Sequence, residues 1–420
     1  MQSTLSEGAQ PPLSALSSTD AVNNVVIFIS DALRYDSLPE KIREKGVTAK
    51  AVAASTFTAN ALPSITSGQY PATHKVWRFQ EDRLASEPAI FSSEEYDIGF
   101  NAETVWLIDE SAKKPPLRWN HQTEEQTIRE LDPPFVHFIH DVGPHAPYGY
   151  DNTVWDSTES FFSAYPEPET LRKLYAKDCE NSAERFLSVL EYLREEGLLD
   201  ETLVVYTSDH GQCLGETHHG GQFGHVDPMC PELVYIPITF IGAGLPAGQD
   251  YDGLLSSVDI APTVLAAQGR QIPHDMDGQQ VWTVGPSADR TARCDVWAHK
   301  NVDIAGRTIT LNAYAATGLW DQYGGQVLQR RSRLQRSGYV AEKLLRGTQS
   351  PVWRPNTSLG AILGLLSTYG RNEITYGAPR ISMSDAQSSF PNRFSEAIEH
   401  EATPDNDELA EKLADLGYLS

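Results

Sequence analysis

Runs of consecutive apolar residues, each as long as a β-strand, recur through the first 250 positions of the chain. They cover residues 24–30, 135–139, 203–206 and 233–241. Polar residues do not alternate with apolar ones inside these runs, and this pattern is typical of strands buried on both faces in a parallel sheet. Pro237 within the fourth run predicts an edge position or a local break in that strand.

A helical repeat of apolar positions spans residues 168–198. Gly197 near its end is typical of a helix C-cap. Because this helix lies between two predicted strands, we expect it to be the right-handed crossover of a parallel unit. Shorter helices are predicted over 122–132 and 256–269.

The pattern weakens after residue 290. It predicts two short strands over 307–311 and 313–316, a buried helix over 361–366, irregular structure over 371–405, and an amphipathic C-terminal helix. The fold class is therefore α/β, with a mixed, mostly parallel sheet between two layers of helices and a smaller C-terminal α+β part. The expected organisation is a disordered leader over 1–22, a metal-dependent catalytic domain over 23–290, and a C-terminal region over 291–420 that packs on the core.

The formal net charge is -24, from 57 acidic and 33 basic residues. This charge argues against nucleic acid or an anionic membrane as a partner, because phosphate groups are bound by basic surfaces. An acidic surface with few lysines suits a salt-rich cytoplasm, where charge repulsion is screened. An ordinary acidic protein is the alternative interpretation.

No run of eighteen apolar residues is present, so no membrane span is predicted. The N-terminal stretch has neither a basic segment nor an apolar segment of the kind found in secretory signals. The four cysteines show no C-x-x-C spacing and are expected to be reduced thiols. These features together predict a cytoplasmic protein.

Acidic and imidazole side chains follow three of the predicted strands. Asp31 follows the first, Asp141 and His145 follow the second, and Asp209 and His210 follow the third. In open α/β sheets, ligands bind at the carboxyl ends of the strands. Asp31 as a helix N-cap, and a turn containing a buried histidine, are the structural alternatives.

A glycine- and histidine-rich loop after the third strand offers three further imidazoles, His218, His219 and His225. With one of them, the set contains three carboxylates and three imidazoles. Such a mixed set suits two divalent cations, with Zn²⁺ or Mn²⁺ favoured, whereas Mg²⁺ or Ca²⁺ would prefer oxygen ligands.

A hydroxyl-rich segment over residues 56–71 offers a nucleophile, and metal coordination would lower the pKa of its alcohol. Composition does not choose among Thr56, Thr58, Ser64, Thr66 and Ser67. Arg34, which follows the first strand, could face an anionic substrate or lie on a helix surface.

Five segments together carry a family resemblance. They are SDALR, TANALPSITSGQYP, HDVGPHAPYG, TSDHG and VDIAPTVLAAQG, in this order between about residues 24 and 270. The set resembles the alkaline phosphatase and sulfatase superfamily, and most of all the sulfatase-like proteins of acidic, salt-adapted archaea. The resemblance implies an alkaline-phosphatase-like three-layer sandwich.

The resemblance also implies a nucleophile. Sulfatases carry a Cys-x-Pro-Ser-Arg motif, and matching the glycine that follows it to Gly68 places Thr58 at the cysteine and Asn60 at the proline. Counting from Pro63 instead would place Ala61 there, which has no reactive atom. Because threonine cannot form the formylglycine that sulfatases use, this match disfavours sulfate-ester hydrolysis.

A threonine nucleophile resembles the nucleotide pyrophosphatase and phosphodiesterase branch. That match implies one cation among Asp31, Thr58, Asp209 and His210. It implies a second cation bound by Asp141, His145 and His225. The predicted substrate-binding residues are Asn60, Arg34 and His140.

The expected activity is metal-dependent hydrolysis of phosphate mono- or diesters, with attack by Thr58. The substrate would be a small-molecule or glycan-linked ester. Alternatives are a sulfatase, a phosphoglycerol-type transferase that acts on a glycan, and a catalytically silent member of the superfamily. The oligomeric state stays open.

Overall fold

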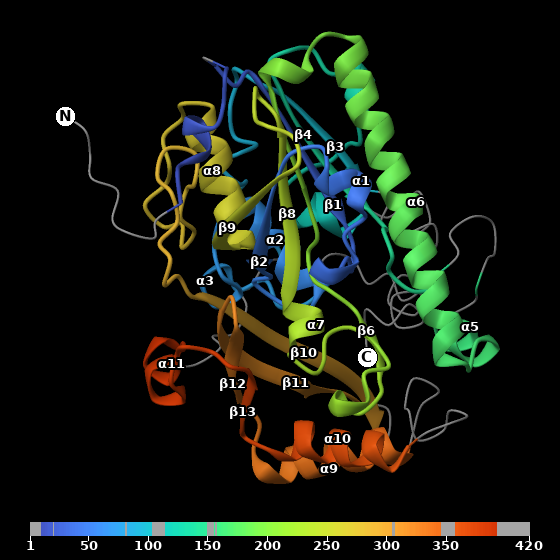
Figure 1. The fold of residues 1–420 in the computed structure, drawn as a ribbon. Helices are drawn as coiled ribbons and strands as arrows, with labels where there is room; N and C mark the ends of the chain where they lie inside the picture. Colours follow the sequence, from blue (N-terminus) through green and yellow to red (C-terminus); the bar gives the residue numbers. More distant parts are fainter. Residues whose placement is uncertain are drawn as a thin grey trace.

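The computed structural model describes residues 10–19, 21–79, 82–102, 114–148, 155, 158–304, 307–345 and 358–392. Within these residues, a seven-stranded sheet lies between helices, and a four-stranded antiparallel sheet lies at one end of it (Figure 1). No helix among them is long and apolar enough to cross a membrane.

The seven-stranded sheet has the order β3-β4-β1-β5-β8-β2-β9. Its strands are β1 (Asn24–Ser30), β2 (Val47–Val52), β3 (Asp97–Ala102), β4 (Phe135–Asp141), β5 (Thr202–Thr207), β8 (Tyr235–Gly242) and β9 (Gln249–Ser256). All run in one direction except β8, which is antiparallel to both neighbours. The mixed, mostly parallel sheet is confirmed.

Three adjacent strands at the centre of the sheet end at the same level. In the parallel pairing, Ile29 of β1 lies beside His140 of β4 and Thr207 of β5. All residues of β1, β4 and β5 are buried, as their apolar runs predict. Their carboxyl ends therefore deliver Asp31, His140 and Asp209 to one edge of the sheet.

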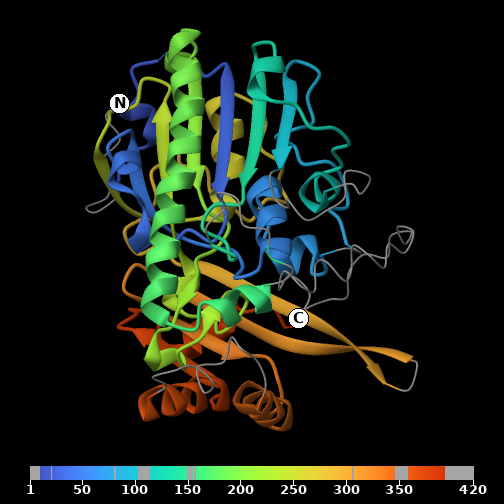
Figure 2. The same cartoon turned by 90° about the vertical axis from the view of Figure 1, so that its right-hand side faces the viewer.

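Helices cover both faces of this sheet, which gives three layers (Figures 1 and 2). The long helix α6 (Pro168–Glu195) packs on one face, where Phe186 contacts Tyr206 with ring centroids 4.6 Å apart. Helices α2 (Thr58–Ser67) and α8 (Ile260–Ala267) pack on the other face. The three-layer prediction is confirmed.

The C-terminal part is built on the antiparallel sheet β10-β11-β12-β13. Its elements are β10 (Ala292–Ile304), β11 (Arg307–Asp321), β12 (Gly324–Gln329), α9 (Arg333–Leu345), α10 (Leu359–Gly370), β13 (Glu373–Gly377) and α11 (Met383–Ser389). This part is tied to the main sheet through Tyr235, whose hydroxyl donates to the carbonyl of Asp321 at 2.6 Å.

Short elements complete the described chain. They are α1 (Glu40–Arg43), α3 (Pro71–His74), α4 (Pro115–Trp119), α5 (Thr158–Ala164), α7 (Pro231–Val234), β6 (Cys213–Leu214), β7 (Phe223–Gly224), and the 3-10 turns η1 (Leu13–Ala15), η2 (Tyr35–Ser37), η3 (Ile128–Glu130), η4 (Leu199–Glu201), η5 (Thr217–His219) and η6 (Ser257–Asp259).

Of the two alternatives predicted for Pro237, an edge position is wrong, because β8 is an interior strand, whereas the pairing on one side of β8 does stop beside this residue. Pro237 pairs only with Lys50 of β2, and the pairing of β8 with β5 ends one residue away at Ile238. The missing N–H of proline is tolerated beyond the end of that ladder. Its carbonyl accepts a hydrogen bond from the Thr207 hydroxyl at 2.7 Å.

Other boundaries also differ. The helix predicted over 122–132 is only the single turn η3, and the stretch 371–405, predicted as irregular, contains β13 and α11. Residues 10–19 of the predicted leader pack on the core, where Leu13 is buried and its amide donates to Val281 at 3.0 Å. The predicted C-terminal helix lies outside the described residues.

Candidate active site

Asp31, Asp209 and His210 are fully buried and offer ligand atoms that lie within 4.8 Å of one another. One oxygen of Asp209 is fixed by the backbone, because Oδ1 accepts from the amides of Ala32 at 3.2 Å and His210 at 2.8 Å. The other oxygen, Oδ2, accepts no hydrogen bond from the described residues and lies 3.4 Å from Nε2 of His210. The backbone thus aims Oδ2 into the cluster.

The tautomer of His210 follows from its backbone contact. Nδ1 lies 2.8 Å from the carbonyl oxygen of Gly211, so Nδ1 bears the proton and donates it. Nε2 therefore presents a lone pair, 3.0 Å from Oγ1 of Thr58 and 3.8 Å from Oδ1 of Asp31. Two carboxylates and one imidazole lone pair converge, and such a set fits a divalent cation.

Thr58 is the first residue of α2 and is fully buried. Its hydroxyl donates to Nε2 of His210. The N-terminus of a ten-residue helix carries partial positive charge, which favours a negative oxygen at this position. Among the hydroxyl residues of 56–71, Thr58 is the one that the structure places against the Asp31, Asp209 and His210 cluster.

The charges in the cluster depend on one another. Burial opposes ionisation of Asp31, but His145, His140 and His210 lower its pKa below the ordinary range. Burial and the charge of Asp31 raise the pKa of Asp209. A bound cation would relieve this repulsion between the two carboxylates.

His140 also belongs to this cluster. Its Nε2 lies 3.4 Å from Oδ2 of Asp31, and both side chains are fully buried. Burial alone would lower the pKa of His140, but the contact with Asp31 raises it instead. His140 therefore holds its proton more tightly than an ordinary imidazole.

His145 and His225 form a pair at the edge of the cluster. Their Nε2 atoms are 3.0 Å apart, and the ring of His225 stacks on His210 with centroids 4.5 Å apart. Burial lowers the pKa of both imidazoles. Gly143 makes this arrangement possible, because its φ is 50° and a Cβ there would lie 2.6 Å from the amide of Asp31.

The loop that bears His225 is fastened to the start of α2. The amide of Val226 donates to the carbonyl of Thr56 at 2.9 Å, and the Thr56 hydroxyl donates to the carbonyl of Val226 at 2.7 Å. This explains why His225 joins the cluster. His218 and His219 instead lie beside Glu232.

The structure does not bring Asp141 to the cluster, in contrast to the prediction. Successive strand residues point to opposite faces, so His140 faces α2 while Asp141 faces α6. Both oxygens of Asp141 accept from Arg185, at 2.5 and 2.8 Å, and Oδ1 also accepts from Ser182 at 2.7 Å. The second predicted cation site is thus left with His145 and His225 and without its carboxylate.

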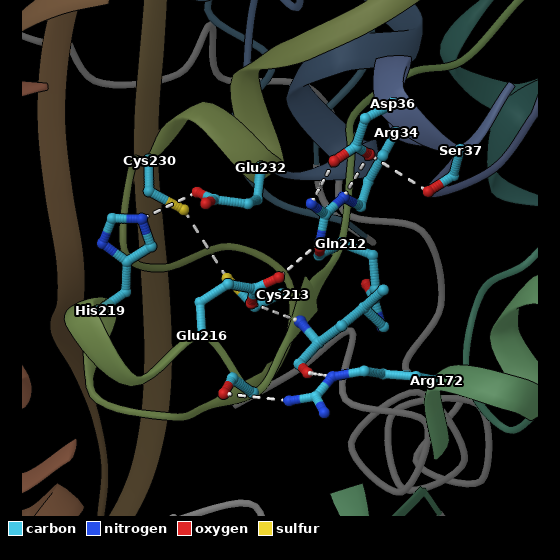
Figure 3. Close-up of polar contacts among 12 residues, drawn as sticks. Arg34, Asp36, Ser37, Arg172, Gln212, Cys213, Glu216, His219, Cys230 and Glu232 are labelled. Carbon is cyan, nitrogen blue, oxygen red and sulfur yellow. Dashed lines mark hydrogen bonds and ion pairs between the residues drawn. The ribbon is translucent and has the colours of Figure 1, made fainter. Parts of the chain in front are cut away.

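Arg34 and Asn60 are also engaged elsewhere. Arg34 forms ion pairs with Asp36 at 2.6 Å and with Glu216 at 2.5 Å, and Figure 3 shows its guanidinium between these two carboxylates. Asn60 donates to the carbonyls of Val76 at 2.9 Å and Trp77 at 3.1 Å. These contacts support the fold, and a substrate-binding role of either residue stays a prediction.

Sequence reasoning missed the turn that supports the cluster. Ala32 has a φ of 64°, in the left-handed region that non-glycine residues seldom adopt. Its amide thereby reaches Asp209, and the next amide, of Leu33, donates to the Ser208 hydroxyl at 2.9 Å. The acidic residue that directly follows a buried strand was the only feature of the sequence that pointed to this turn.

Comparison with known proteins places this site in a family. A family model described as "Sulfatase" matches residues 118–269. The low-salt glycan biosynthesis sulfotransferase Agl7 of Haloferax volcanii is 43% identical over 411 residues, which cover 97% of this chain and 99% of that protein.

Solved structures share the fold. The putative sulfatase yidJ of Bacteroides fragilis is 14% identical, with a TM-score of 0.53 over 84% of this chain and 98% of its own. A phosphonate monoester hydrolase of Silicibacter pomeroyi is 18% identical, with a TM-score of 0.52 over 72% and 86%.

The whole-length relative overturns the expected activity. Its name describes a glycan sulfotransferase, whereas the sequence favoured a hydrolase of phosphate esters. Two of the alternatives agree better with this relative than the main prediction does, namely a sulfatase and a transferase that acts on a glycan. Taken together, the family model, the whole-length relative and the fold show that this chain belongs to the sulfatase family of the alkaline phosphatase superfamily.

Proposed function

We propose that this protein transfers a sulfuryl group from a sulfate-ester or phosphosulfate donor to a hydroxyl of a glycan. The observation that carries the proposal is the 43% identity to a glycan sulfotransferase over 97% of the chain. The buried Thr58 hydroxyl, 3.0 Å from His210, supports a covalent route through this site.

The residues present fit a divalent cation, and Asp31, Asp209 and His210 would hold it. When bound, such a cation would lower the pKa of the neighbouring Thr58 hydroxyl, which would then give up its proton, and it would draw negative charge from the sulfuryl oxygens. In that case the lone pair of His210 Nε2 would face the cation and would no longer accept the Thr58 proton.

Transfer takes two displacements at sulfur. In the first, Oγ1 of Thr58 forms a bond to sulfur while the bond from sulfur to the donor oxygen breaks, and His140 gives its proton to that leaving oxygen. In the second, the glycan hydroxyl returns a proton to His140 as its oxygen bonds to sulfur, and the bond to Thr58 breaks. Both steps conserve protons and sulfuryl groups.

The test uses 4-nitrophenyl sulfate as donor and a neutral oligosaccharide as acceptor, with and without added divalent cation. Mass spectrometry should detect a sulfated oligosaccharide and a sulfated peptide that contains Thr58. Thr58→Ala should lower transfer on the order of a thousandfold, because it removes the nucleophile. Ser67→Ala, on the last turn of the same helix, is the matched control.

Three results would overturn the proposal. One is release of inorganic sulfate without a sulfated oligosaccharide, which would indicate a hydrolase. Another is turnover of 4-nitrophenyl phosphate in preference to the sulfate. The third is unchanged transfer by Thr58→Ala, which would exclude the covalent route.

A further inference from the structure

A second group of potential metal ligands lies outside the Thr58 site. Nε2 of His219 is 2.8 Å from Oε2 of Glu232, and Nε2 of His218 is 3.5 Å from Oε1 of the same carboxylate. One ligand atom from each of the three residues lies within 4.8 Å of the other two. Figure 3 shows the Glu232 carboxylate and the His219 ring pointing toward each other.

The environment of this group suits a cation that is partly shielded from water. His219 is 4% exposed and Glu232 is 13% exposed, whereas His218 is 66% exposed. The hydrogen bond between His219 and Glu232, at 2.8 Å, holds the carboxylate beside the imidazoles. Both oxygens of one carboxylate thus face two imidazoles.

We propose that His218, His219 and Glu232 bind a zinc ion. Two imidazole nitrogens and one carboxylate oxygen are a common set of three protein ligands for Zn²⁺, and a water molecule would take the fourth position. The exposed side of His218 leaves room for that water. The set differs from the Thr58 cluster, which has two carboxylates and one imidazole.

The backbone around these ligands is held in place from two sides. Glu232 belongs to α7, and its carbonyl accepts from the amide of Gln212 at 3.1 Å. His219 ends the turn η5, which packs on α10 so closely that a Cβ on Gly364 would lie 2.2 Å from the carbonyl of Thr217. The three ligands are therefore presented by packed elements.

The proposed ion would also connect two elements of the fold. It would join the turn η5 to α7, which are the two ends of the segment that bears His225. The amide of Gly211, directly after His210, donates to the carbonyl of Leu233 at 2.8 Å. Zinc at this position would thus brace the segment between η5 and α7, and with it His225, and α7 is linked to the position after His210.

The experiment measures zinc directly. The full-length protein is stripped with a chelator, dialysed against limiting Zn²⁺ and analysed by plasma mass spectrometry. His218→Ala should lose about one zinc per chain relative to wild type, because it removes one of three ligands. His274→Ala, at an exposed histidine outside both clusters, should lose none.

Two further variants separate this site from the Thr58 site. Asp209→Asn should keep the zinc that His218→Ala loses. The double variant should lose the zinc bound by His218, His219 and Glu232 as well as any cation bound at the Thr58 site. Co²⁺-loaded Asp209→Asn should show visible absorption typical of four-coordinate cobalt, and adding His218→Ala should abolish it. Equal zinc content and affinity in wild type and His218→Ala would overturn the proposal and leave a hydrogen-bonded His219–Glu232 pair.

Discussion

At the scale of single residues, two adjacent positions in one strand have different environments, one at the Thr58 cluster and one on the opposite face of the sheet. His140 and Asp141 are neighbours at the end of β4, yet only His140 faces the Thr58 cluster. The sequence places both at a strand end, where ligands bind. It does not contain the information that α6 would supply Arg185 and Ser182 to the opposite face.

Asp141→Asn should test this division. We expect the free energy of unfolding to fall by about 2–3 kcal/mol, because the substitution leaves Arg185 without its carboxylate at a largely buried site. The cation content of the Thr58 site should not change. Asp31→Asn is the control and should lower cation content. Loss of cation from a folded Asp141→Asn variant would show that Asp141 is a ligand after all.

His74 is a buried histidine that takes no part in the proposed mechanism. Its Nδ1 accepts from the amide of Val76 at 3.0 Å, and its Nε2 contacts the Ser64 hydroxyl at 2.9 Å. Burial lowers its pKa to about 3. It therefore stays neutral in the folded protein at a pH where the unfolded chain is already protonated.

The sign of the pH effect follows. Between about pH 6.5 and pH 4, the unfolded state binds one proton more than the folded state at His74, so acid lowers the free energy of unfolding. His74→Gln should reduce this slope by up to about 1.4 kcal/mol per pH unit. Urea denaturation at several pH values measures it, with exposed His274→Gln as control. Equal slopes in wild type and His74→Gln would contradict the expectation.

At the scale of elements, the central strands were predictable and the outer ones were not. The strands β1, β4 and β5 are continuous apolar runs. The strands β2 (VTAKAV), β3 (DIGFNA) and β9 (QDYDGLLS) each contain a charged residue, β3 and β9 also contain glycine, and part of each strand is less buried. Their pairing depends on partners distant in sequence, which local periodicity does not report.

The helix that bears Thr58 shows a related limit. Pro63 lies inside α2, and proline there removes one helical hydrogen bond, so the segment had the composition of a loop. Its end is set by Gly68, which has a φ of 70° and packs against Met276 and Pro262. Gly68, which was matched to the glycine that follows the sulfatase motif, is thus also the residue that ends α2.

Gly68→Ala should lower the free energy of unfolding by about 2 kcal/mol. About half of this is the cost of a left-handed alanine, and the rest is contact of the new Cβ with Met276, 3.0 Å away. Gly269→Ala is a matched control, because Gly269 has a φ of 68° but open space around it. Thermal and urea denaturation compare the two. Equal losses would show that packing at Gly68 adds nothing.

At the scale of the whole molecule, net charge is the dominant feature. A charge of -24 on 420 residues favours expansion of the chain through self-repulsion. Salt screens this repulsion with a Debye length of about 10 Å at 0.1 M and about 3 Å at 1 M. The fold therefore has a stability that depends on its solvent as well as on its contacts.

The midpoint of thermal unfolding should rise by several degrees as KCl increases from about 0.1 M to about 1 M. The comparison uses sucrose at equal osmolality as control, because sucrose stabilises by exclusion without screening charge. A midpoint that rises equally in sucrose and in KCl would argue against an electrostatic cause.

One contact joins the loop that bears His225 to the helices of the C-terminal part. Asp227, two residues after His225, accepts hydrogen bonds from Tyr339 of α9 and Tyr369 of α10, and lies 3.2 Å from Nζ of Lys343. These helices of the C-terminal part therefore help to set the position of the His225 imidazole. A random library screened for inactive clones should therefore recover substitutions in α9 and α10. A truncated protein that lacks these helices should be inactive.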